Sequence, residues 1–228
     1  MEIKLKLIAP MPVPPEGRGV IEKMLKARRR AASPGTIIDF VIPEQGPPSL
    51  TNSSELFLSA EAIFPEVIKS PDQGYSAVIV DCTCDQLFPE VAEKLTIPLV
   101  PALHSSLHLA TMLCKRFAII TPTPGQGKIY SGLVNQYGLS KNLVSVQEKA
   151  VDFISGESGD EEIASILAGA GQVALQQGAQ CIVLGCTALT LESALQKKLG
   201  VPVLAPGNVA VKTAEMLIKL GLYYPFYS

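Results

Sequence analysis

Residues 74–83 read GYSAVIVDCT, and residues 178–187 read GAQCIVLGCT. The match continues without a gap when residues 74–113 are aligned with residues 178–217. A repeat of this length is typical of a duplicated domain, because solenoid repeats are much shorter. The chain of 228 residues is therefore predicted to consist of two related halves that meet near Lys115.

Each repeat predicts a strand, a helix and a second strand. Residues 77–80 and 181–184 are short apolar runs rich in β-branched side chains, which are typical of buried parallel strands. Strands are predicted at residues 1–8, 37–42, 77–80, 97–100, 117–120, 181–184 and 201–204, and helices at residues 86–95, 158–178 and 191–199. Strands that alternate with helices form parallel sheets covered on both faces. The predicted fold is α/β, with two pseudo-symmetric lobes, parallel-sheet cores and an active site in the cleft between the lobes.

The composition is that of a globular protein, with 47% apolar residues, 18% charged residues and a net charge of -2. This charge gives no reason to expect nucleic acid or an anionic membrane as a partner. The longest basic run, Arg28 to Arg30, is predicted to be the solvent-facing side of a helix. No run is long and apolar enough to span a bilayer, and the first eight residues lack the layout of a signal peptide. Five cysteines at irregular spacing then predict reduced thiols and a cytoplasmic location.

Cys82 and Cys186 occupy equivalent positions in the two repeats, and each is followed by threonine. Each directly follows a predicted strand and precedes a predicted helix, where ligands bind in open α/β sheets and where the helix field favours a thiolate. A two-base racemase needs one group to take a proton from one face of a carbon and another to return a proton to the opposite face. We therefore predict that Cys82 and Cys186 are catalytic. Thr83, Thr187 and the adjacent N–H groups are predicted to bind the substrate and its developing negative charge.

At these residues the chain resembles the Asp/Glu/hydantoin racemase superfamily, and the resemblance covers nearly the whole chain. It rests on DCTCD at residues 81–85 and LGCTAL at residues 184–189. The Cys-x-x-Asp spacing and the segment GPPS at residues 46–49 are similar to the hydantoin racemase branch. The resemblance implies one catalytic cysteine from each lobe and no cofactor, neither PLP nor a metal.

The resemblance also implies further substrate contacts and the lobe boundaries. Asp85 is expected to orient groups near Cys82. The other expected substrate-binding residues are Ser49, Asn52, Ser53 and Thr121. Because the last helix of family members returns to the first lobe, the expected lobes are residues 1–103 plus 208–228, and residues 104–207.

The predicted function is a racemase that acts on a hydantoin or an amino-acid-like small molecule. The motifs depart from the named branches, since residues 86–87 are Gln-Leu where the hydantoin branch carries Pro-Gly. A maleate-isomerase-like or decarboxylase activity is therefore the alternative within the superfamily. Retention of both cysteines favours two-sided proton transfer. The substrate, its handedness and the oligomeric state, a homo-oligomer included, stay open.

Two alternatives come from other classes of protein. A redox or metal module could use Cys82 with Cys84, or His104 with His108, although zinc needs a third or fourth ligand that the sequence does not supply. The other is a small-molecule binding protein in which the cysteines are dispensable.

Three further features complete the sequence predictions. Cys114 and Cys181 lie within apolar patterns and are predicted to pack in the core. Residues 121–128 are predicted to form a loop at the cleft mouth. The aromatic segment at residues 223–227 is predicted to pack on a lobe or at a subunit interface.

Overall fold

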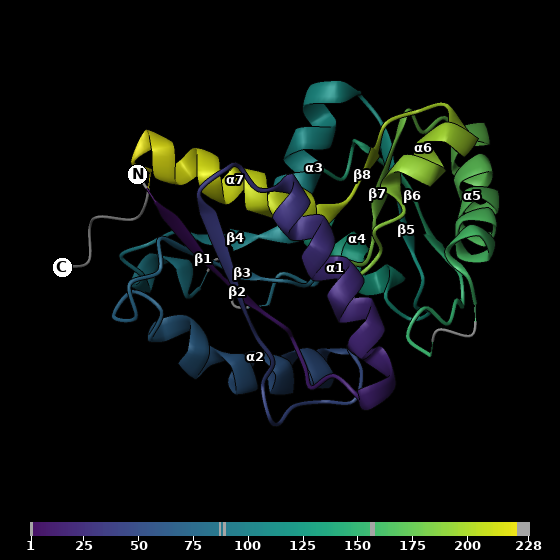
Figure 1. Ribbon diagram of the computed structural model, residues 1–228. Coiled ribbons are helices and arrows are strands. Elements are labelled where there is room, and N and C mark those ends of the chain that lie inside the picture. The colour runs from purple at the N-terminus through teal and green to yellow at the C-terminus, as the bar shows by residue number, and fades with distance from the viewer. Residues whose placement is uncertain (1, 87, 89, 156–157, 223–228) are drawn as a thin grey trace.

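The computed structural model describes residues 2–86, 88, 90–155 and 158–222. It contains two four-stranded sheets in which every recorded strand pair is parallel, and helices flank both sheets (Figure 1). The strand order is β2-β1-β3-β4 in the first sheet and β6-β5-β7-β8 in the second, so the topology repeats. The predicted α/β fold with two pseudo-symmetric lobes is confirmed.

The elements have the following bounds. The first sheet consists of β1 (Ile3–Ile8), β2 (Thr36–Val41), β3 (Ala77–Val80) and β4 (Leu99–Pro101). The second consists of β5 (Phe117–Thr121), β6 (Leu143–Glu148), β7 (Cys181–Leu184) and β8 (Val203–Leu204). The helices are α1 (Arg18–Ala31), α2 (Ser53–Ile68), α3 (Ala102–Leu113), α4 (Gly127–Gln136), α5 (Asp160–Gln176), α6 (Glu192–Leu199) and α7 (Pro206–Leu220), with 3-10 turns at Pro15–Gly17 and Ala92–Lys94.

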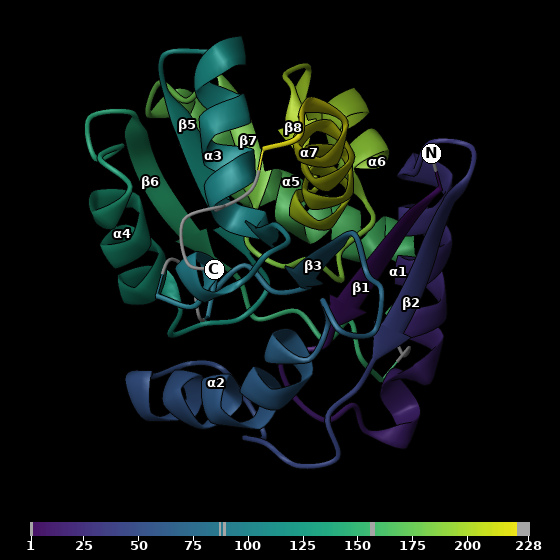
Figure 2. The ribbon, with the colours of Figure 1, turned by 90° about the vertical axis from the view of Figure 1, so that its left-hand side faces the viewer.

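Every residue of β3 and β7 is buried, which explains why these two strands read as continuous apolar runs. In the first lobe α2 and α7 cover opposite faces of the sheet (Figure 2). In the second lobe α5 and α6 cover one face, and α3 and α4 cover the other. Cys181 and Cys114 pack into this second core, as their apolar surroundings predict.

Two helices pass between the lobes. Leu103 and Leu107 of α3, which follows the last strand of the first sheet, pack against Phe117 and Ile119 of the second sheet. Conversely, α7 follows the last strand of the second sheet and packs on β1 and β3 of the first. The expected lobe boundaries fall within the first turns of α3 and α7, and their exact positions stay a prediction.

The predicted solvent-facing run of arginines is only partly correct. Residues 28–30 do lie in a helix, α1, and Arg29 and Arg30 are exposed. Arg28 is instead fully buried, because its guanidinium pairs with the buried carboxylate of Asp81. The sequence pattern could not reveal this partner, which lies on another element.

The predicted helix at residues 86–95 is wrong. Its described residues form turns and one short 3-10 segment, Ala92–Lys94. Val91, Ala92 and Leu95 still enter the core of the first lobe, so the apolar spacing reflects burial and not helical geometry.

Two further predictions concern the chain's exterior. The aromatic segment at residues 223–227 lies outside the described residues. Within the described ranges, no helix has the length and apolar character needed to cross a membrane.

Candidate active site

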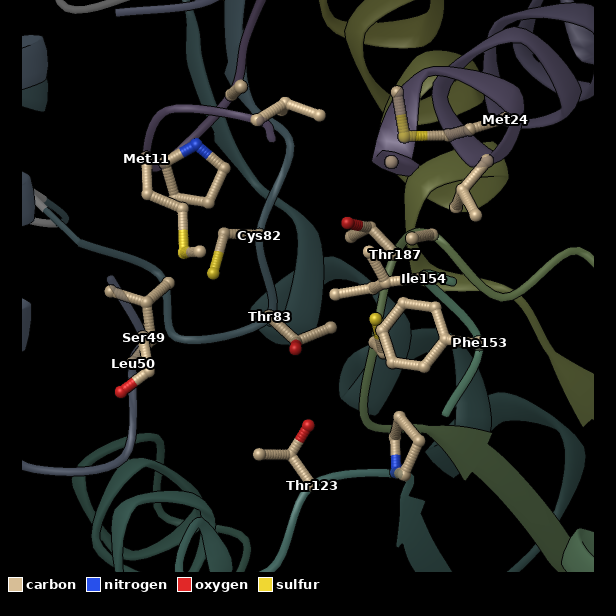
Figure 3. Close-up of a pocket in the computed structure, with 18 of the residues that line it drawn as sticks. Met11, Met24, Ser49, Leu50, Cys82, Thr83, Thr123, Phe153, Ile154 and Thr187 are labelled. Carbon is tan, nitrogen blue, oxygen red and sulfur yellow. The ribbon is translucent and has the colours of Figure 1, made fainter. Parts of the chain in front are cut away.

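The two repeated cysteines lie just beyond the carboxyl ends of equivalent strands. Cys82 follows β3 after one residue, and Cys186 follows β7 after one residue. Both line one cavity of about 590 Å³, which also contacts the first turns of α1 (Figure 3). A volume of this size is typical of small-molecule sites. Duplication and the strand-end rule therefore bring the two thiols to a shared site.

The cavity wall is largely apolar. Figure 3 shows Met11 beside Cys82 on one side, with Met24, Phe153 and Ile154 on the other. The remaining large apolar residues of the wall come from the loop after β1, from α1, β2 and the loop before α2, and from the segment after β6: Val13, Val20, Ile21, Phe40, Leu50 and Val151. A ligand in this cavity buries mostly carbon surface.

Charged side chains on the wall are few and already have partners. Among the described lining residues only Asp81 and Asp152 are charged, and there is no lysine, arginine or histidine. Asp81 pairs with Arg28, which is buried behind it. Asp152 accepts hydrogen bonds from the backbone N–H groups of Ser155 and Ile154, at 3.0 and 2.9 Å, and hydrogen bonding by Ser155 first, then by Ile154, lowers its pKa. The lining thus offers no cationic side chain to a ligand carboxylate.

Neither cysteine lies at the N-terminus of a helix, so that prediction is wrong. Turns follow Cys82, and α6 begins only at Glu192. The hydrogen-bond donor at Cys82 is instead a local backbone group, because the Cys82 Sγ accepts a hydrogen bond from the N–H of Cys84 at 3.3 Å. At the equivalent position of the second repeat, burial has the largest influence on the pKa of the Cys186 thiol, and the N–H of Ala188 acts against it. In each repeat the N–H two residues after the cysteine therefore acts on its thiol.

Burial raises the pKa of the Cys186 thiol to about 12, an effect that the N–H of Ala188 opposes and the nearby Cys82 reinforces. Cys186 is therefore a protonated thiol at neutral pH. The pKa of Cys84 is also raised, first by its hydrogen bond with Cys82 and then by burial.

Five of the nine residues predicted for the site line the cavity: Ser49, Cys82, Thr83, Cys186 and Thr187. The hydroxyls of three of these already have protein partners. Thr187 Oγ1 donates to Asp81 O at 2.8 Å, and Ser49 Oγ donates to Glu55 Oε1 at 2.6 Å. Thr83 Oγ1 lies 2.8 Å from the hydroxyl of Tyr130.

The structure does not bring Asp85 to the cavity. Its carboxylate accepts the N–H groups of Leu103 and His104, at 3.0 and 2.8 Å, and the hydroxyl of Tyr137 at 2.8 Å. Its backbone has a φ of 47°, the left-handed region, which turns the chain away from the thiols. Burial raises the pKa of Asp85 to about 7. Asp85 therefore caps the start of α3.

Three other predicted contacts also lie outside the cavity. Asn52 caps α2 by accepting the N–H of Glu55 at 3.0 Å, and Ser53 is exposed in the first turn of α2. Thr121 is fully buried and donates to Gln126 Oε1 at 2.7 Å. Asn52 and Thr121 therefore stabilise segments behind the wall, and none of the three side chains lines the cavity.

Sequence reasoning missed most of the apolar wall. The expected loop at residues 121–128 does reach the cavity through Thr123, Pro124 and Gln126. Phe153 and Ile154 lie in a segment with no recognisable pattern. The only signal at Met24 is its place on α1, and nothing in the sequence indicated which face of that helix meets the site.

The histidines lie away from this cavity. The His104 ring packs against those of His108, Tyr137 and Phe88, with centroid distances of 4.4, 4.2 and 5.3 Å. Burial, and then the charge of His108, lower the pKa of His104 to about 4. In the described ranges no group of three or more His, Cys, Asp or Glu side chains is placed to hold a metal ion.

A duplicated α/β fold with one cysteine per lobe on a shared cavity defines a class of two-lobed small-molecule enzymes. A family model described as Asp/Glu/Hydantoin racemase matches residues 17–214, and the chain belongs to this family.

Individual relatives agree with this membership. The hydantoin racemase of Pseudomonas sp. (strain NS671) is 29% identical over 221 residues, which are 96% of this chain and 87% of the relative. That of Paenarthrobacter aurescens is 26% identical over 211 residues, or 91% and 89% of the two chains. The solved structure of allantoin racemase from Klebsiella pneumoniae has a TM-score of 0.88 at 26% identity and covers 100% of this chain and 92% of its own. The chain is thus an enzyme of the racemase class, an isomerase.

Proposed function

We propose that the protein is a cofactor-independent racemase in which Cys82 and Cys186 exchange protons with opposite faces of a carbon next to a carbonyl. The observation that carries the proposal is the presence of both repeat-equivalent thiols on one cavity. For one hand of substrate, the Cys82 thiolate takes the proton, and the Cys186 thiol gives its proton to the opposite face. That step leaves Cys82 as the thiol and Cys186 as the thiolate, and this form of the enzyme takes the other hand of substrate with the two roles exchanged.

The charge that develops on the carbonyl oxygen needs fixed donors. Backbone N–H groups of the two cysteine turns are candidates, because the hydroxyls of Ser49, Thr83 and Thr187 already have protein partners. Thr83 and Thr187 therefore contribute to substrate binding through their backbones and their place on the wall. Asp85 acts at a distance, by holding the turn after Cys82 against the start of α3.

The cavity favours a neutral ring amide over a free amino acid. A carboxylate buried in this apolar space without a cationic partner is unfavourable. A hydantoin carries no carboxylate, and its acidic carbon is flanked by a carbonyl. The best substrate class is therefore a hydantoin with an apolar substituent, in accord with the hydantoin racemases among the relatives.

The test is solvent deuterium incorporation at the α-carbon, measured on 5-substituted hydantoins and on free amino acids. The wild type should place deuterium in both enantiomers of the apolar hydantoins. Cys82→Ser and Cys186→Ser should impair exchange on opposite faces. Cys114→Ser is the matched control, because Cys114 packs in the second core away from the cavity.

Each competing function gives a different result. Loss of carbon dioxide from a malonate-type acid, or cis–trans conversion of maleate, with no exchange on hydantoins would point to the alternatives within the family. Turnover that survives both cysteine changes would indicate that the thiols are dispensable. Exchange abolished by dialysis against EDTA, and restored by a metal, would contradict the cofactor-independent mechanism.

Cellular location and assembly belong to the same proposal. A reducing cytoplasm suits an enzyme whose catalytic groups are thiols, and all five cysteines are free. The partner is a small molecule. Sedimentation of the purified protein would decide between a monomer and a homo-oligomer.

A further inference from the structure

Arg28 connects the two cysteine turns from the first lobe. It extends from α1, is fully buried, and reaches the carboxylate of Asp81 with Nε at 3.3 Å and Nη2 at 3.2 Å. Nη2 also donates to the carbonyl oxygen of Thr187, and Nη1 donates to Asn208 Oδ1 at 2.9 Å. One guanidinium therefore holds the residue before Cys82 and the residue after Cys186.

Tyr130 connects the same turns from the second lobe. It extends from α4 and is fully buried. Its hydroxyl lies 2.8 Å from Thr83 Oγ1 and donates to the carbonyl oxygen of Gly185. Gln126 Oε1 lies 3.1 Å away. This hydroxyl therefore holds the residue before Cys186 and the residue after Cys82.

These two contacts are equivalent under the pseudo-symmetry of the fold. α1 follows β1 and α4 follows β5, and these two strands occupy the same place in their sheets. Each side chain contacts the residue before the cysteine of its own lobe and the residue after the cysteine of the other lobe. We call Arg28 and Tyr130 the two bridges.

We infer that the two bridges are positioning residues that fix the separation of the two catalytic thiols across the substrate. This inference rests on the proposed function of Cys82 and Cys186. Neither bridge lines the cavity, so both act through the turns that carry the cysteines. A direct hydrogen bond between the two cysteine turns adds to the contacts of the two bridges, because Thr187 Oγ1 donates to Asp81 O at 2.8 Å.

The chemistry needs such a device because the thiols belong to different lobes. The thiolate that takes the proton and the thiol that returns one must lie on opposite faces of the carbon, each about 3–3.5 Å from it, and a misplacement of about 1 Å can cost roughly a hundredfold in rate. Both bridges are buried, so water does not compete for their hydrogen bonds. Burial also raises the pKa of Tyr130 well above its ordinary value, so it stays a hydroxyl donor.

The two bridges predict a specific kinetic signature. Exchange of the α-proton with return to the same face uses only one thiol. Inversion uses both thiols at their correct separation. Loosening a bridge should therefore slow inversion more than it slows exchange into the recovered starting enantiomer.

The first test is Tyr130→Phe, which removes one hydroxyl and keeps the ring. We expect the ratio of inversion to exchange with retention to fall at least tenfold. Tyr75→Phe is the matched control, because Tyr75 precedes β3 whereas Cys82 follows it, and its hydroxyl donates to Asp39 at 3.0 Å outside the cavity lining. Arg28→Lys should act in the same direction as Tyr130→Phe, because lysine keeps the charge but lacks the planar fork.

The second test needs no turnover. Dibromobimane alkylates two neighbouring thiols, and in a Cys84→Ser background only Cys82 can react from the first cysteine turn. Peptide mapping should find Cys82 joined to Cys186, with cross-linking slowed several-fold by Tyr130→Phe and unchanged by Tyr75→Phe.

The outcomes separate the inference from the proposed function. If Tyr130→Phe lowers inversion and exchange equally and cross-links like the wild type, Tyr130 is merely structural and the inference is overturned. If the wild type exchanges no α-proton on any compound, the proposed function fails. The cross-linking comparison then still decides whether the bridges set the thiol separation.

Discussion

Replacing Gly207 with alanine tests the packing on which one bridge depends. Gly207 lies in the first turn of α7, and a Cβ there would be 1.9 Å from Arg28 Nη2 and 2.0 Å from its Cζ. The guanidinium cannot move aside freely, because Asp81 and Thr187 hold it in a fully buried position. The added methyl group must therefore displace either Arg28 or the start of α7.

The expected magnitude follows from three contributions. Overpacking a buried site costs about 1–3 kcal/mol, and weakening a buried ion pair adds up to about 3 kcal/mol. The better helix propensity of alanine offsets at most about 1 kcal/mol of this destabilisation. We expect Gly207→Ala to lower the free energy of unfolding by about 2–4 kcal/mol, which lowers Tm by roughly 5–15 °C for a chain of this size.

Urea unfolding followed by circular dichroism measures this change. The matched control is Gly169→Ala, because Gly169 lies within α5 and an added Cβ meets nothing within 4 Å. That variant should be more stable than the wild type by up to about 1 kcal/mol. The two alanine variants should thus shift stability in opposite directions.

A double-mutant cycle makes the test sharper. In an Arg28→Met background the guanidinium is absent, so Gly207→Ala should lose most of its cost. Equal stability of Gly207→Ala and the wild type would refute the reasoning. The reasoning would also fail if Gly207→Ala lowered the free energy of unfolding as much in the Arg28→Met background as in the wild type.

Three other predictions concern pH and specificity. Hydrogen bonds from Ser33 and other donors outweigh burial and lower the pKa of Glu215 to about 2, so its contribution is present above about pH 4.5 and lost as pH falls towards 2. Glu215→Gln should therefore cost about 3 kcal/mol in urea unfolding at pH 7 and much less at pH 3. Alkylation of Cys186 by iodoacetamide should accelerate about tenfold per pH unit between pH 7 and 10, and a flat profile in peptide mapping would contradict its raised pKa. Phe153→Ala should lower kcat/KM for a benzyl-substituted hydantoin about tenfold relative to a methyl-substituted one, whereas Phe57→Ala, on the exposed side of α2, should not change this ratio.

The features that the sequence predicted well are those that depend on local pattern and duplication. The repeat identified Cys82 and Cys186 as equivalent, and the rule for parallel strands then placed both at the same edge of their sheets. The structure puts them on one cavity. The overall α/β architecture followed from the same alternation of strands and helices.

The features that the sequence could not predict depend on distant partners or on side-chain direction. A run of basic residues has the same sequence pattern whether Arg28 faces solvent or forms a buried ion pair, and its partner Asp81 lies on another element. The spacing of Asp85 after Cys82 gives proximity in the chain, but its left-handed backbone directs the carboxylate to α3. Thr121 likewise directly precedes wall residues in the chain, but it is fully buried and its hydroxyl donates to Gln126.

The passage of α7 back to the first sheet constrains how the protein is made. Strands β1 to β4 leave the ribosome early, but Ala210, Val211 and Ala214, which complete one face of their core, emerge only after the strands of the second lobe. Contacts between such distant parts of a chain form late and slow folding. Part of the first sheet therefore stays uncovered until α7 has been synthesised, which happens only after all the strands and flanking helices of the second lobe. This order of completion predicts that nascent chains lacking α7 expose an apolar surface that chaperones bind.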